Sequence, residues 1–115
     1  MNKIKELFNF WKDLNIKVGE KLGSLEMTEV KKLRMEQSKI EDEVYEILKE
    51  KATPEVAKIL PERCGDMEIG INIRDKEFYF VMEDPDPESE KLMAIVFGID
   101  ERIKIVNDFN IDEYD

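Results

Sequence analysis

Residues Asp66–Phe109 decide the fold, and they read DMEIGINIRDKEFYFVMEDPDPESEKLMAIVFGIDERIKIVNDF. Three runs in this segment are rich in β-branched and aromatic residues and predict successive strands: Met67–Ile73, Lys76–Glu83 and Lys91–Phe97. The first run alternates apolar and polar residues, so we expect one buried and one solvated face. The third run is apolar on both faces, which is typical of a central strand or of a strand buried on both sides.

Residues Arg102–Phe109 fit two interpretations. The β-branched residues of this run have high strand propensity. However, Ile99, Ile103 and Val106 also have the spacing of one helical face. We favour a fourth strand, with the helix as the alternative. Residues 110–115 form an acidic tail.

The preceding residues predict three helices. Between Asn2 and Leu22, apolar residues recur every three or four positions, as on one face of an amphipathic helix. A second helix is expected to begin near Thr28 as its N-cap, and the short connection between the two helices favours an antiparallel hairpin. Thr53, followed by proline and glutamate, predicts the start of a short third helix that runs through Leu60.

These elements together predict an α+β fold. An N-terminal antiparallel helical hairpin plus a short third helix is followed by a three- to four-stranded antiparallel β-meander. A chain of 115 residues has the size of one domain. We therefore interpret residues 1–115 as a single domain with a helical half (1–62), a sheet half (66–109) and an acidic tail (110–115).

Charge is distributed unevenly along the chain. The formal net charge is −10 at pH 7. Residues 1–63 carry 13 basic and 13 acidic side chains, whereas residues 64–115 carry 5 and 15. Phosphate groups would meet net negative charge on the sheet half, so we expect no direct nucleic-acid binding there. The charged fraction of 40% is also typical of proteins from thermophiles, in which ion-pair networks contribute more to stability because the cost of desolvating charges falls with temperature.

The composition excludes several chemistries. The chain has no histidine, which removes histidine bases, Ser-His and Cys-His nucleophile pairs and histidine-containing zinc sites. The single cysteine, Cys64, excludes an intramolecular disulfide, and without a base beside it we interpret it as an unreactive thiol. The five glycines do not have the spacing of a phosphate-binding loop. We therefore expect no cofactor and no enzymatic activity.

The acidic connection between the second and third strands is the clearest candidate site. Its carboxylates favour contact with a basic protein partner. One alternative is a divalent-cation site, because Asp84, Asp86 and Glu88 alternate as in a calcium loop. Ser89, however, stands where that loop needs glycine, and Ile95 stands where it needs glutamate. The other alternative is an ordinary solvated loop. The candidate partner-binding residues are Glu83, Asp84, Asp86, Glu88 and Glu90.

The helical hairpin offers a second candidate surface. Phe10 and Ile16 lie off the apolar face of the first helix, and Gln37 occupies an inward heptad position of the second helix. Trp11 is either a core residue or part of an exposed aromatic patch. The second helix is basic in its first part and acidic in its last, so two copies packed antiparallel would bring opposite charges together. The candidate self-association residues are Phe10, Trp11, Ile16 and Gln37.

Three functions follow from these features. The first is a small acidic protein-binding module, such as an inhibitor, adaptor or chaperone-like binder, that engages a basic partner through its sheet half. The second is a homo-oligomer, most simply a homodimer, assembled through the hairpin. The third, ranked lowest, is a carboxylate-based divalent-metal-binding protein or enzyme. The sequence contains no signal-peptide core and no apolar run long enough to span a membrane, so we expect a cytoplasmic protein.

Overall fold

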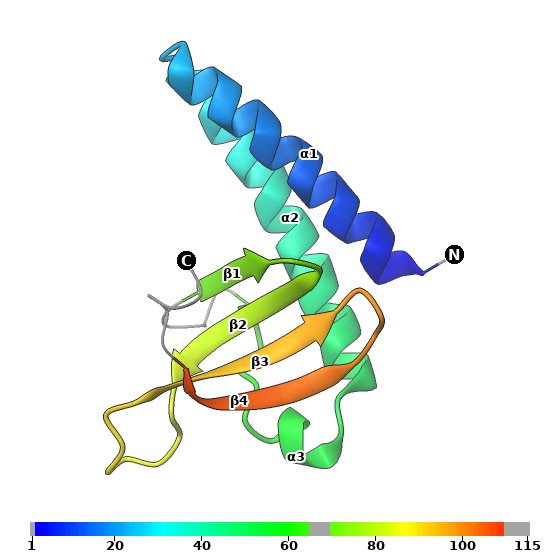
Figure 1. The fold of residues 1–115 in the computed structure, drawn as a ribbon, viewed down its shortest axis with the longest axis vertical. Helices are drawn as coiled ribbons and strands as arrows, with labels where there is room; N and C mark the ends of the chain where they lie inside the picture. Colours follow the sequence, from blue (N-terminus) through cyan, green and yellow to red (C-terminus); the bar gives the residue numbers. More distant parts are fainter. Residues whose placement is uncertain (1, 65–69, 110–115) are drawn as a thin grey trace.

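A computed structural model describes residues 2–64 and 70–109, and it shows a long helical hairpin followed by a four-stranded antiparallel sheet (Figure 1). The strands are hydrogen-bonded in the order β1-β2-β3-β4, so the sheet is a meander. The predicted α+β fold is confirmed. The elements are α1 (Lys3–Gly23), α2 (Met27–Lys51), α3 (Pro54–Ala57), β1 (Gly70–Arg74), β2 (Glu77–Glu83), β3 (Leu92–Gly98) and β4 (Ile103–Phe109).

Side-chain capping fixes the start of α1. The Asn2 side chain accepts a hydrogen bond from the Ile4 backbone N–H at 2.8 Å, which satisfies one of the free donors at the helix N-terminus. The amide nitrogen of the same side chain donates to the Ile99 carbonyl, which lies in the turn between β3 and β4. Asn2 therefore also attaches the first turn of α1 to the sheet.

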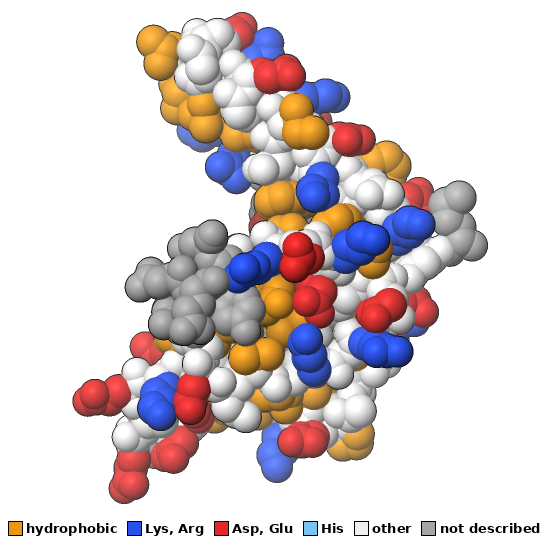
Figure 2. All heavy atoms as spheres, viewed as in Figure 1, with side chains coloured by type: hydrophobic (Ala, Val, Ile, Leu, Met, Phe, Trp, Pro, Cys, Tyr) orange, Lys and Arg blue, Asp and Glu red, His pale blue; other side chains and the backbone are white. Residues whose placement is uncertain are grey.

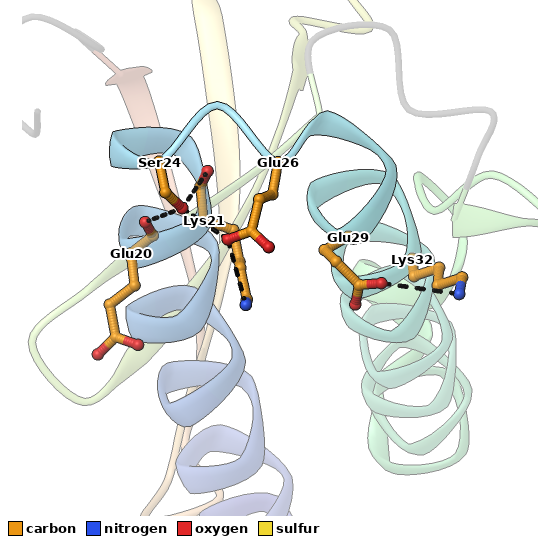
Figure 3. Close-up of polar contacts among 6 residues, drawn as sticks. All are labelled: Glu20, Lys21, Ser24, Glu26, Glu29 and Lys32. Atoms are coloured by element: carbon orange, nitrogen blue, oxygen red, sulfur yellow. Dashed lines mark hydrogen bonds and ion pairs between the residues drawn. The ribbon is translucent and has the colours of Figure 1, made fainter.

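The connection between α1 and α2 differs from the prediction (Figure 3). Helix α2 begins at Met27, with Glu26 rather than Thr28 at the N-cap position. The Glu26 side chain does not cap the helix. It instead accepts a hydrogen bond from the Ser24 hydroxyl at 2.7 Å and one from the Lys21 ammonium at 3.3 Å. These contacts fold the connection back onto the end of α1, so the second helix starts earlier than its sequence predicts.

The end of the third helix was also predicted less accurately. Helix α3 ends at Ala57, although the side chain of Thr53 caps it as expected, by accepting a hydrogen bond from the Val56 N–H. Strand β1 is described from Gly70, and the earlier part of the predicted first strand, residues 67–69, lies outside the described residues. The fourth strand is confirmed, because β4 pairs with β3 from Ile103 to Phe109, with one irregularity in register between Leu92 and Met93.

One face of the sheet packs against the helices. Phe78 and Phe80 of β2 are fully buried, as the alternation in this strand predicts. The Phe78 ring meets Phe8 of α1 edge-on, with ring centroids 5.6 Å apart. The Phe80 ring lies 5.5 Å from that of Tyr45 on α2. The two helices are thus attached to the same strand through separate aromatic pairs.

The opposite face of the sheet is also buried. Tyr79 and Val81 of β2 form a second apolar cluster with Ala94 and Val96 of β3 and with Phe109 of β4. Residues Met93–Gly98 of β3 are all buried. The prediction that the third strand is central or covered on both sides is confirmed.

Gln37 lies inside the hairpin itself. It is only 2% exposed, and its Nε2 donates to the Trp11 backbone carbonyl of α1 at 3.3 Å. Its Oε1 accepts a hydrogen bond from Arg34 at 3.2 Å. The Gln37 amide therefore finds its hydrogen-bond partners in α1 and α2 of one chain. The buried side chain does not carry the free-energy cost of an unpaired amide.

Substitutions at Gln37 test this interpretation. Gln37→Leu should leave the free energy of unfolding unchanged or raise it by up to about 1 kcal/mol, because an apolar side chain of similar size replaces a buried polar one. Gln37→Ala should lower it by about 1–2 kcal/mol, because it leaves a cavity between the helices. Urea unfolding followed by the fluorescence of the single tryptophan measures both changes. Equal destabilisation by both variants would contradict the prediction.

Candidate protein-binding site on the β2–β3 loop

The acidic connection forms an ordered loop between β2 and β3. Its ends are joined by a backbone hydrogen bond from the Asp84 N–H to the Lys91 carbonyl, at 3.1 Å. A second backbone hydrogen bond, from the Ser89 N–H to the Asp86 carbonyl, closes a turn inside the loop. The loop thus lies directly beyond the last paired residues of β2 and β3, which are Glu83 and Leu92.

Side chains of the loop hold its backbone. The Asp84 Oδ1 accepts from the N–H of Asp86 at 2.9 Å, and the Asp86 Oδ1 accepts from the N–H of Glu88 at 3.0 Å. Each of these aspartates precedes a proline, whose fixed φ suits such turns. The Ser89 hydroxyl accepts from the N–H of Lys91 in the same way. Consecutive turns therefore define the shape of the loop.

The carboxylates of the loop form no ion pair with any described residue. In the described part of the chain, none of the five predicted partner-binding residues lies within salt-bridge distance of a lysine or arginine. All except the half-buried Asp84 are exposed. Figure 2 shows acidic side chains gathered at the end of the molecule where this loop projects. The structure thus brings the predicted acidic residues together on one exposed surface.

A groove opens beside the loop, between α3 and the last two strands. It has a volume of about 550 Å³. Met93, Ile105 and Ile59 provide its apolar lining, and Asp84 and Pro85 connect it to the acidic loop. The groove also has polar residues at its edge: Glu55, Lys58 and Asn107.

A larger groove of about 740 Å³ lies at the other end of the strands, against α1. Phe8, Asn9 and Lys12 of the helix face the turns that follow β1 and β3. Its charged lining residues are Lys12, Lys76, Asp75, Glu77 and Asp100. Acids and bases are thus mixed around this groove, unlike the single sign of charge on the β2–β3 loop.

The predicted self-association residues do not lie on one surface. Phe10 and Ile16 are exposed, as expected from their positions off the apolar face. Gln37 is buried inside the hairpin, and Trp11 is half-buried, with its indole N–H donating to the Glu41 carboxylate at 3.2 Å. The prediction that Trp11 and Gln37 mediate contact between chains stays a prediction, and in this structure both make their contacts within one chain.

Among the described residues, Glu41 and Cys64 have raised pKa values. Burial raises the pKa of Glu41, and the neighbouring Asp42 raises it further, against the opposing effect of the Trp11 hydrogen bond. Burial also raises the pKa of the Cys64 thiol to about 12, with smaller contributions from Asp42 and Glu41. Cys64 is half-buried against the main core. A thiol in this environment remains protonated at neutral pH and is a poor nucleophile.

The described residues form neither a cluster of metal ligands nor a helix that could span a membrane. No three histidine, cysteine or acidic residues among them lie in an arrangement that could hold a metal ion. None of the described helices has the length and apolarity needed to cross a membrane. Asp84 Oδ1 and Asp86 Oδ1 accept backbone hydrogen bonds within the loop.

Comparison of the chain with protein-family models, with curated proteins and with solved structures gives no significant match. The candidate site is therefore interpreted from its own geometry.

Alkylation tests the environment of Cys64. We expect the folded protein to react with iodoacetamide at neutral pH on the order of a hundredfold more slowly than the unfolded chain. The high pKa leaves little thiolate, and the greater nucleophilicity of that thiolate compensates only in part. Mass spectrometry of timed samples measures the rate. Equal rates for the folded protein and for the protein in denaturant would contradict the assignment.

The pH dependence of stability tests Glu41. The raised pKa of Glu41 means that the folded state binds a proton more tightly than the unfolded state. Stability is therefore lost as the pH rises from 4.5, the ordinary pKa of a glutamate, through the raised pKa of Glu41. Glu41→Gln keeps an acceptor for Trp11 and should be more stable than the wild type at pH 7. The difference should disappear at acidic pH. Thermal unfolding at several pH values measures it, and a difference independent of pH would contradict the assignment.

Proposed function

We propose that the protein is a small protein-binding module that engages a basic partner through its β2–β3 loop. One observation carries the proposal: five carboxylates gather on an ordered, exposed loop without ion-pair partners in the described part of the chain. The proposal takes the cytoplasm as its setting, which is the compartment that the sequence predicts.

Elsewhere the chain pairs many of its exposed charges. Lys51 contacts Glu101 at 2.8 Å, Lys104 contacts Glu77 at 3.5 Å, and Lys91, at the end of the loop, contacts Asp108 of β4 rather than a loop carboxylate. The loop carboxylates thus repel one another without compensation from the described residues around them. A basic partner would relieve this repulsion, and long-range attraction would raise the rate of association.

The order of the loop also favours binding. A loop whose backbone is already held by hydrogen bonds loses less conformational entropy when it binds. The turns at Asp84 and Asp86 hold the backbone and leave Glu83, Glu88 and Glu90 exposed. The adjoining groove, with its apolar lining from Ile59 after α3 and from β3 and β4, adds an apolar surface beside the charges. Interfaces commonly combine an apolar centre with a polar rim.

Neutralisation of the loop tests the proposal. The variant Glu83→Gln, Asp86→Asn, Glu88→Gln, Glu90→Gln removes four charges and keeps the oxygen of Asp86 that accepts the hydrogen bond. Tagged protein is loaded with a lysate of the source cells at low salt and eluted in salt steps, and the captured basic protein is then purified and its affinity measured. We expect release at raised salt and an affinity weaker by about tenfold or more for the variant.

A matched control removes the same number of charges from the helices. Asp13→Asn, Glu20→Gln, Glu36→Gln, Glu50→Gln changes exposed acids that form no ion pair in the described part of the chain. This control should bind the partner as the wild type does. If the loop variant and the control lose affinity equally, net charge rather than the loop is responsible, and the proposal is wrong. It is also wrong if the loop variant keeps full affinity.

A further inference from the structure

The outer part of the hairpin extends beyond the sheet (Figure 1). In this part the sheet does not cover the helices, and large apolar side chains are exposed there. Met35 of α2 is 61% exposed, and Leu25 in the turn is 81% exposed. Figure 2 shows hydrophobic side chains gathered at the end of the hairpin. The exposed apolar residues of this region are Ile16, Leu22, Leu25, Met27 and Met35.

Met35 belongs to a stripe along the outer side of α2. The stripe consists of Lys31, Met35, Ser38 and Asp42, which follow one another at spacings of four, three and four residues. Eleven residues complete about three helical turns, so Lys31 and Asp42 lie on the same side of the helix, roughly 16 Å apart along its axis. All four residues are exposed.

The charges at the two ends of this stripe have no ion-pair partner within the described part of the chain. Some neighbouring charges of α2 do have one: Lys32 pairs with Glu29 at 3.8 Å, and Glu43 pairs with Lys3 of α1 at 3.7 Å. Lys31 and Asp42 pair with neither their own helix nor α1. The stripe thus presents, in sequence, a cation, an apolar side chain and an anion, and neither charge is neutralised by a described residue.

We propose that two copies of this chain associate through the stripe, with the two α2 helices antiparallel about a twofold axis. Lys31 of each copy lies against Asp42 of the other, and the Met35 side chains lie near the axis between these two ion pairs. The surface is distinct from the β2–β3 loop, so the proposal goes beyond the proposed function and does not depend on it.

The pattern of charge identifies a second copy as the occupant. A twofold axis makes a surface contact itself, so the surface must be complementary to its own reversed copy. Between residues 31 and 50 of α2, basic side chains predominate first and acidic side chains last, with Glu36 and Lys49 as exceptions, and antiparallel pairing brings each group beside the other. The basic residues are Lys31, Lys32, Arg34 and Lys39, and the acidic residues are Glu41, Asp42, Glu43, Glu46 and Glu50.

The two end turns of α2 carry charges that suit the helix dipole: Glu29 lies in the first turn, and Lys49 and Lys51 lie in the last. The basic and acidic groups of the stripe lie between these end turns, where the dipole has little effect. Their order matters for a second helix packed antiparallel, because its acidic group then lies beside the basic group. Met27, four residues before Lys31, extends the apolar part of the stripe towards the end of the hairpin.

Charge reversal tests the twofold pairing. The wild type should have twice its 13.6 kDa chain mass in sedimentation experiments at high protein concentration and should dissociate on dilution. Asp42→Lys places lysine against Lys31 at both sites and should raise the dimer dissociation constant by about tenfold or more. Lys31→Asp should do the same through two acidic pairs.

A mixture of the two variants provides the decisive measurement. In a mixed dimer, the lysine introduced by Asp42→Lys faces the aspartate introduced by Lys31→Asp. At the other site the native Lys31 of the first variant faces the native Asp42 of the second, so both ion pairs return. An equimolar mixture should therefore dimerise as the wild type does, although each variant alone does not. Glu36→Lys changes charge by the same amount as Asp42→Lys on another side of α2 and serves as the control, which should leave dimerisation unchanged.

Each alternative outcome would overturn the proposal. A wild type that remains monomeric at all concentrations would contradict the proposed dimer. A dimer that survives both reversals uses another surface. Variants that lose dimerisation and do not regain it on mixing do not pair in the twofold register. Circular dichroism and thermal unfolding of each variant confirm that the fold is intact, so a lost dimer reports on the interface.

Discussion

The difference in length between the helices and the strands governs the shape of this molecule. Helices of 21 and 25 residues are about 32 and 37 Å long, whereas strands of seven residues span about 23 Å. Phe78 and Phe80 attach the sheet to Phe8 and Tyr45, which lie at opposite ends of the two helices in sequence but on the same part of the hairpin. The rest of the hairpin therefore extends past the sheet.

The extended part of the hairpin has to be stable without the sheet. Val18 and Val30 are buried between the helices, and the Gln37 amide bonds to the backbone of α1. At the end, Ser24 and Lys21 bond to Glu26 and hold the turn. These contacts use the facing sides of the two helices. They leave Met35 and Leu25 exposed on the outside of the hairpin.

The sequence predicted the fold well where periodicity carries the information. Alternation in β2 indicated which side chains face the helices, and the continuous apolar run of β3 indicated burial on both faces. The start of α2 and the end of α3 were less accurate. At the start of α2, the hydrogen bonds of Glu26 to Ser24 and Lys21 within the connection accompany a helix that begins before the predicted Thr28 cap. The candidate loop was identified from its charges. Its order was also present in the sequence, as aspartates that precede prolines, but the groove beside it depends on contacts between distant segments.

The two charged surfaces differ in what they can recognise. The β2–β3 loop carries one sign of charge, so a second copy of the same loop would be repelled and only a basic surface is attracted. The outer side of α2 carries both signs in an ordered series, so its best complement is its own reversed copy. The loop lies at one end of the molecule, whereas the stripe runs along α2, which extends towards the other end (Figure 1). A dimer formed through α2 therefore leaves both loops free, and two linked loops would bind a basic partner with repeated sites more tightly than one.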